Sequence, residues 1–191
     1  MKQEAIDKAT ARLEKANESL AKLNNCTNHK EFSSAWADFL LAFDGVFEML
    51  KQGARENPKT RQWYGGKNNK EFKDPLIQYL LQARNSEHHG LEPVTELQPG
   101  YTTIGGKTTR TDNLSISMSF DEYQAAASQG PVVLQAAGEN LVPVTDTRYG
   151  TTFNAPAKHL EQPLRDRSPR GVARLGLAYA SGLIEEAKKL V

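Results

Sequence analysis

The sequence has one cysteine, no long apolar run and almost no net charge. Cys26 alone cannot form an internal disulfide or a cysteine-based metal site. The longest apolar run, FLLAF at 39–43, is far shorter than the roughly 20 residues that cross a membrane. The N-terminal segment MKQEAIDKATARLEK lacks the apolar region of a secretion signal. These absences argue against a disulfide scaffold and a membrane protein, and they predict a cytoplasmic location with no membrane partner.

The net charge of +1 gives the chain no overall attraction to nucleic acid, but the charge is unevenly distributed. Residues 51–73 hold seven Lys and Arg residues against two Glu, and residues 165–174 hold four Arg residues against one Asp. Such segments can attract phosphate backbones. The same composition is typical of solvated loops, so both interpretations stay open.

Two amphipathic helices are predicted in the first part of the chain. Residues 3–24 carry apolar side chains at alternating three- and four-residue steps, the pattern of a helix with one buried face. Residues 29–54 form the most apolar element, with Trp36, Phe39, Phe43 and Phe47 on one face. We expect both helices to contribute to the core of a bundle.

A loop and a third helix are predicted next. Pro58 and the Gly65–Gly66 pair indicate a loop over residues 56–73, which Trp63 and Tyr64 attach to the core. Asp74 is a candidate N-cap, and Pro75 suits the first helical position. Gly90 can take the left-handed conformation that ends this helix. Residues 1–92 are therefore predicted to be a bundle of three helices.

The composition changes after Pro93. Short segments rich in Thr, Val and Ile follow, and NLSISMSF at 113–120 alternates apolar and polar residues as a half-buried strand does. Residues 93–156 are predicted to be a small antiparallel β insertion. Ser168 and Pro169 then begin a last helix, so that residues 157–191 return to the bundle. The expected fold is α+β: about four helices with an inserted antiparallel β subdomain.

Several common motifs are absent. GYTTIGGKTT at 100–109 lacks the glycine spacing of a phosphate-binding loop and precedes no predicted helix, so a glycine turn between two strands explains it better. The sequence contains no HExxH, GxSxG or EF-hand pattern. We therefore expect no metal site and no cofactor.

The end of the third helix, ARNSEHHG, carries the chemistry of greatest interest. Arg84 and His88 share a helix face, and His89 lies about 140° around the helix from Arg84 unless the last turn frays. An arginine can neutralise a phosphate and a histidine can move a proton, which suits phosphodiester cleavage. Alternatively, Arg84 pairs with Glu87 and the histidines only favour the negative helix end. Spacing alone leaves both open.

This segment resembles the motif of the HEPN superfamily, an Arg followed after four to six residues by a His, often with a polar residue directly after the Arg. Arg84 and His89 match it, with Asn85 at the polar position. The stretch WYGGKNNKEFKDPLIQYLLQARNSEHHGL is also similar to a group of uncharacterised bacterial proteins. The resemblance covers residues 30–91 and leaves the β insertion unexplained.

The resemblance implies a metal-independent endoribonuclease of the toxin or defence type that acts as a homodimer, with RNA as substrate and an antitoxin or other protein as partner. His89 would transfer the proton, Arg84 would stabilise the phosphate and Asn85 would orient them. Secondary binding candidates are Glu87, His88, Trp63, Tyr64 and Lys67. The alternative is a non-enzymatic interaction protein in which ARNSEHHG is structural, since many relatives have no activity.

Overall fold

The computed structural model describes residues 1–70, 72–89, 93–104, 107–111, 133–135, 137–146 and 148–191, with residues 119, 121, 124, 125, 128 and 130. The chain divides into two compact units. The first comprises Met1–Thr95 with Leu141–Val191, and the second comprises Glu96–Asn140. The elements named below all belong to the described part of the chain.

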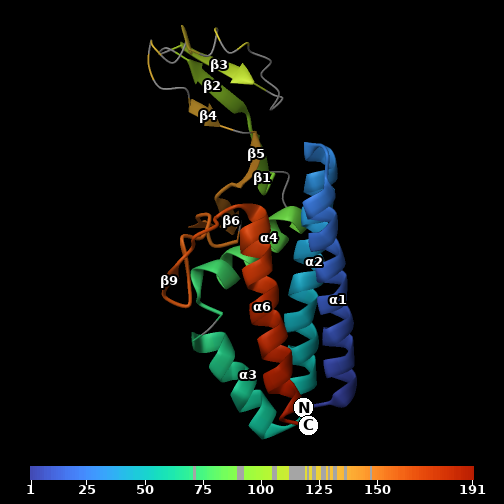
Figure 1. Ribbon diagram of the computed structural model, residues 1–191. Coiled ribbons are helices and arrows are strands. Elements are labelled where there is room, and N and C mark those ends of the chain that lie inside the picture. The colour runs from blue at the N-terminus through green and yellow to red at the C-terminus, as the bar shows by residue number, and fades with distance from the viewer. Residues whose placement is uncertain are drawn as a thin grey trace. The chain divides into compact units, whose positions relative to one another are not determined.

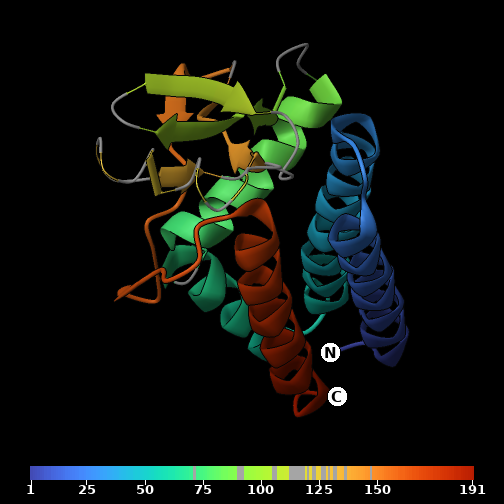
Figure 2. The same cartoon turned by 45° about the horizontal axis from the view of Figure 1, so that its top comes forward.

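The first unit is a helical bundle (Figure 1). Its helices are α1 Gln3–Asn25, α2 His29–Ala54, α3 Pro58–Lys70, α4 Pro75–His89 and α6 Pro169–Lys188. Figures 1 and 2 show α1, α2 and α6 running alongside one another. None of the described helices is long and apolar enough to cross a membrane. Together with the antiparallel strands described below, these helices make the fold α+β and mainly helical, as predicted.

Side-chain caps begin α2, α4 and α6. Asn28 Oδ1 accepts a hydrogen bond from the Glu31 N–H at 2.9 Å, which begins α2. Asp74 Oδ1 accepts from the Leu76 N–H at 3.0 Å, which begins α4. Ser168 Oγ begins α6 in the same way. Each cap satisfies a backbone donor that the helix itself leaves unpaired. The predicted starts at Asp74 and Ser168 are confirmed.

Aromatic side chains of α2 form the centre of the core. The rings of Trp36, Phe39, Phe43 and Phe47 follow one another along one face, with successive centroids 5.4, 5.8 and 4.9 Å apart. All four side chains are buried. These residues are three or four positions apart, so they lie on one face of the helix. This spacing of apolar residues is the pattern that predicted the helix from the sequence.

Helix α6 packs against the other helices, as its apolar stripe predicted. A Cβ at Gly176 would lie 2.6 Å from the Leu80 side chain and 3.3 Å from Phe43, so α6 approaches α4 and α2 closely there. The Arg170 Nε donates to the Leu23 carbonyl at 2.9 Å, which joins α6 to α1. Packing of this helix on the bundle is confirmed.

The predicted loop over 56–73 is wrong, because residues 58–70 form α3. Pro58 occupies the first position, and Asn57 Oδ1 accepts from the Lys59 N–H at 2.9 Å. The Tyr64 hydroxyl donates to the Phe47 carbonyl at 3.1 Å and so holds α3 against α2. These contacts stabilise the helix despite a cost of about 1 kcal/mol for each glycine of the Gly65–Gly66 pair.

The strands form small, separate sheets. They are β1 Thr95–Gln98, β2 Gly100–Ile104, β3 Lys107–Thr111, β4 Val133–Gln135, β5 Gly138–Leu141, β6 Val144–Asp146, β7 Thr151–Phe153, β8 Lys158–His159 and β9 Gln162–Pro163. Strands β3, β2 and β4 make an antiparallel sheet, while β1 pairs with β5, β6 with β7 and β8 with β9.

The boundaries of the β insertion differ from the prediction. The compact second unit ends at Asn140 rather than at residue 156, because β6 to β9 belong to the helical unit. In that unit the buried Tyr79 of α4 donates through its hydroxyl to the Val142 carbonyl at 2.8 Å.

Two further predictions concern the second unit. Ile104 of β2 pairs with Lys107 of β3, in the region where a turn between two strands was predicted. The predicted strand at 113–120 lies outside the described residues, except for Ser119.

Glycine substitutions test the close contact between α1 and α2. A Cβ added at Gly53 would lie 2.3 Å from the Ala5 Cβ, whereas one added at Gly182 of α6 meets nothing within 4 Å. We expect Gly53→Ala to lower the free energy of unfolding by about 1–3 kcal/mol, because the helices must separate. Gly182→Ala should instead raise it by about 0.5–1 kcal/mol, as alanine favours a helix. Urea denaturation measures both, and equal effects would refute this account of the contact.

Candidate functional site

The ARNSEHHG segment lies at the C-terminal end of α4. Arg84 is about a quarter exposed, while Asn85 and Glu87 are exposed. Arg84 Nη1 donates to Asn85 Oδ1 at 3.2 Å, so two of the three predicted catalytic residues contact each other. His88 and His89 are helical in their backbone, but their side chains lie outside the described residues.

Arg84 also contacts α2. Its Nε lies 3.1 Å from Asp44 Oδ2, an ion pair without the angle of a hydrogen bond. The side chains of Arg84 and Asp44 are 24% and 21% exposed, so water screens the pair only in part. Burial raises the pKa of Asp44 above its usual value, and the charge of Arg84 offsets part of that effect. The ion pair therefore limits where the guanidinium can lie.

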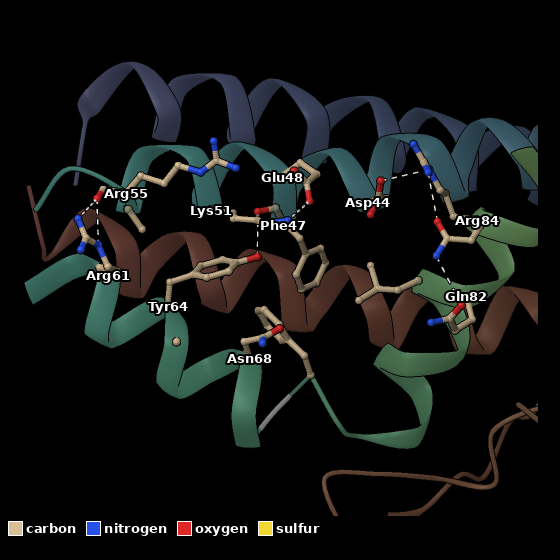
Figure 3. Close-up of a pocket in the computed structure, with 15 residues that line it drawn as sticks. Asp44, Phe47, Glu48, Lys51, Arg55, Arg61, Tyr64, Asn68, Gln82 and Arg84 are labelled. Carbon is tan, nitrogen blue, oxygen red and sulfur yellow. Dashed lines mark hydrogen bonds and ion pairs between the residues drawn. The ribbon is translucent and has the colours of Figure 1, made fainter. Parts of the chain in front are cut away.

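A cleft of about 930 Å³ lies beside this ion pair, in the helical unit (Figure 3). Residues of α2, α3 and α4 line it, together with residues close to their ends. The charged and hydroxyl-bearing members include Asp44, Glu48, Lys51, Arg61, Tyr64 and Arg84. Arg84 lies at one end of this cleft, and Arg55 and Arg61 lie at the other (Figure 3). Asn85, which contacts Arg84, also lines the cleft.

The charges in the cleft do not cancel. Asp44 faces Arg84, and Glu48 Oε1 lies 2.8 Å from Lys51 Nζ. Arg55 and Arg61 also line the cleft, and neither forms an ion pair with a carboxylate among the described residues. The cleft thus carries a surplus of positive charge, which suits an anionic ligand.

Tyr64 contributes an uncharged wall to the cleft. Its ring meets the ring of Phe72 edge-on at 5.5 Å, and its hydroxyl is held by the Phe47 carbonyl. Burial raises the pKa of Tyr64, with further contributions from the charges of Glu48 and Asp44. The hydroxyl therefore stays protonated at neutral pH and acts as a hydrogen-bond donor.

Trp63 and Lys67, which were secondary candidates, contact a different helix. The Trp63 Nε1 donates to Glu186 Oε2 at 3.3 Å, and Lys67 Nζ donates to Glu186 Oε1 at 3.0 Å. Neither residue lines the cleft. Their contacts fix α3 to α6, and Tyr64 alone among the aromatic candidates belongs to the cleft.

Sequence reasoning overlooked the residues of α2 that face Arg84 and its neighbours. Asp44 lies directly after Phe43 in the most apolar helix, and Glu48 follows it four residues later, on the same side. The sequence feature that could have indicated them is this pair of carboxylates, one helical turn apart beside the apolar face. Arg55 and Arg61 were visible only as part of the basic segment 51–73.

No protein-family model, curated protein or solved structure matches the chain. In the described part of the chain, no three His, Cys, Asp or Glu residues gather as a group that could hold a metal ion. The motif of α4 and the geometry and charge of the cleft are therefore the features of the chain that bear on its function.

Proposed function

We propose that this chain is a HEPN-like endoribonuclease of the toxin or defence type that cuts RNA without a metal ion. The observation that carries the proposal is the contact between Arg84 and Asn85 at the end of a positively charged cleft. His89 follows as the last residue of the same helix. Arg84, Asn85 and His89 match the Arg, polar and His positions of the HEPN motif.

The proposed reaction is an internal transfer within RNA. The ribose 2′-oxygen forms a bond to the adjacent phosphorus, and the bond from phosphorus to the 5′-oxygen of the next nucleotide breaks. His89 moves a proton to or from one of these oxygens, and Arg84 stabilises the charge of the phosphate. The products are a 2′,3′-cyclic phosphate and a 5′-hydroxyl.

Asn85 and Asp44 would position Arg84 for this reaction. Asn85 Oδ1 accepts from Arg84, and Asn85 Nδ2 donates to Gln82 Oε1 at 3.5 Å, while Asp44 faces the guanidinium from α2. A guanidinium held from two sides loses less conformational freedom when phosphate binds. We further propose that a cytoplasmic homodimer brings two such motifs into one active site, and that a protein partner controls it.

A non-enzymatic interaction protein is the second candidate. The observation in its favour is that Arg84 joins α4 to α2 through Asp44. An ion pair of this kind can serve only to hold two helices together, with no ligand involved. In that case the segment would be structural, and Arg84 would affect stability but no reaction.

Histidine variants test the nuclease proposal. In EDTA, we expect the protein to cut single-stranded RNA and to leave a 2′,3′-cyclic phosphate, which end-group analysis detects. His89→Ala should slow cutting by about 10²–10⁴-fold, because the group proposed to transfer the proton is lost. His88→Ala is the matched comparison, one residue away and outside the motif spacing, and it should slow cutting less than His89→Ala does. Undiminished cutting by the His89 variant would eliminate this mechanism.

A further inference from the structure

The end of the cleft opposite Arg84 has its own chemistry. Arg55 follows α2 as its C-cap residue, and Arg61 lies on α3. Asp44 of α2 and the C-cap residue Arg55 are eleven positions apart, which corresponds to roughly 16 Å along the helix axis. Figure 3 shows both arginines at this end of the cleft. A ligand that reached from Arg84 to these arginines would have to be an extended one.

Arg61 is held in place by the backbone. Its Nε and Nη2 both donate to the Arg55 carbonyl oxygen, at 3.1 and 2.6 Å. A guanidinium has five N–H donors, so this arrangement uses two and leaves three. The orientation is fixed before any ligand binds, which lowers the entropic cost of binding.

The carboxylates of the cleft do not neutralise this end. Asp44 pairs with Arg84 and Glu48 pairs with Lys51, as described above. The Arg55 side chain is exposed and makes no ion pair within the part of the chain that is described. Two guanidinium groups that lack carboxylate partners in one cleft suit a phosphate, which accepts hydrogen bonds in the geometry that arginine offers.

We propose that Arg55 and Arg61 form a second phosphate-binding subsite, which holds the RNA strand at a phosphate other than the one being cut. The proposal rests on the nuclease function and deepens it. The substrate is then a strand that spans the cleft, with its reacting phosphate at Arg84 and a remote phosphate at the subsite. Binding at the remote phosphate raises affinity without taking part in the reaction.

The test measures binding and cutting separately. Binding uses a single-stranded 2′-O-methyl RNA, which lacks the attacking hydroxyl, in EDTA over a range of salt concentrations. We expect Arg55→Gln and Arg61→Gln each to weaken binding and to reduce the slope of log affinity against log salt by about 0.7, the value for one phosphate contact on a single strand. Lys59→Gln is the matched control, since Lys59 is an exposed cation of α3 that does not line the cleft.

The kinetics of cutting give a second measurement, which distinguishes a role of Arg55 and Arg61 in RNA binding from a purely structural role. With a longer oligonucleotide, both Arg variants should raise KM and leave kcat unchanged. With a dinucleotide, whose single phosphate occupies the Arg84 end, the same variants should behave as the wild type does. Arg61 binds the backbone carbonyl of residue 55, which the Arg55→Gln variant keeps. Arg55→Gln therefore leaves this contact at the end of α2 intact, and it still tests the subsite if Arg61→Gln perturbs folding.

The outcomes separate the two proposals. If the wild-type protein neither binds nor cuts RNA, the nuclease function and the subsite both fail. If it cuts RNA but the Arg55 and Arg61 variants retain the wild-type salt slope and KM, only the subsite fails. Arg61 then serves only to bind the carbonyl of Arg55, the residue that caps the end of α2. A loss of kcat on the dinucleotide would also contradict a remote subsite.

Discussion

Replacing Arg84 by alanine is expected to slow RNA cutting by about 10²–10³-fold. The guanidinium stabilises charge that develops on the phosphate, and the loss of one such preorganised donor costs about 2.7–4 kcal/mol in the transition state. Arg84→Lys should recover part of the rate, because it keeps the charge but loses the planar fork. Single-turnover kinetics with excess enzyme measure the effect on the chemical step directly.

Stability measurements on Arg84 and Asp44 distinguish catalysis from structure. Both side chains are more than a fifth exposed, so we expect Arg84→Ala to lower the free energy of unfolding by no more than about 1 kcal/mol. Asp44→Asn, which keeps the shape but removes the negative charge, should reduce the cutting rate while leaving stability nearly unchanged. An Arg84→Ala variant that lost about 3 kcal/mol, in a protein that cuts no RNA, would support the interaction protein instead.

Replacing Asp74 by alanine is expected to cause a loss of stability of about 3 kcal/mol. The Asp74 side chain is 5% exposed and accepts hydrogen bonds from the Leu76 N–H at 3.0 Å and the Leu160 N–H at 2.7 Å. Its Oδ1 also lies 2.8 Å from His159 Nδ1. The substitution removes a helix cap, worth about 0.5–2 kcal/mol, and leaves buried donors unpaired. Urea denaturation at neutral pH measures the change.

Asp74 should also make the protein sensitive to acid. Burial raises the pKa of Asp74, but hydrogen bonds from His159, Leu160 and Ile77 outweigh it, and the pKa lies below its usual value. The folded state therefore favours the ionised carboxylate. Its stabilising contribution is present above the unfolded pKa of about 3.9 and is lost as the pH falls through the lower, folded value.

The acid effect is measured by urea denaturation between neutral pH and pH 2. Asp74→Asn should show a weaker decline in unfolding free energy below about pH 4 than the wild type, because the titrating group is gone. Asp146→Asn is a matched control: Asp146, at the end of β6, also accepts two backbone hydrogen bonds, but from Arg148 and Tyr149 of an exposed turn. An unaltered acid profile in the Asp74 variant would contradict its role.

The sequence by itself determined the features that depend on neighbouring residues. Four of the helices followed from apolar spacing, and the beginnings of α4 and α6 followed from Asp74 and from Ser168 with Pro169. Periodicity and capping act within a few residues, so a single sequence is enough to recognise them. The positions of Arg84 and Asn85 on a helix were predicted for the same reason.

Only the tertiary structure decided which distant residues meet. Helix α3 contains two glycines that favour a loop, and its contacts with Phe47 and Glu186 stabilise it. His159 reaches Asp74 from 85 positions away, and Asp44 reaches Arg84 from a different helix. These pairs follow from how the helices and β8–β9 pack, since packing energy depends on the whole core and not on local spacing. The cleft and its surplus of arginines arise from the same packing.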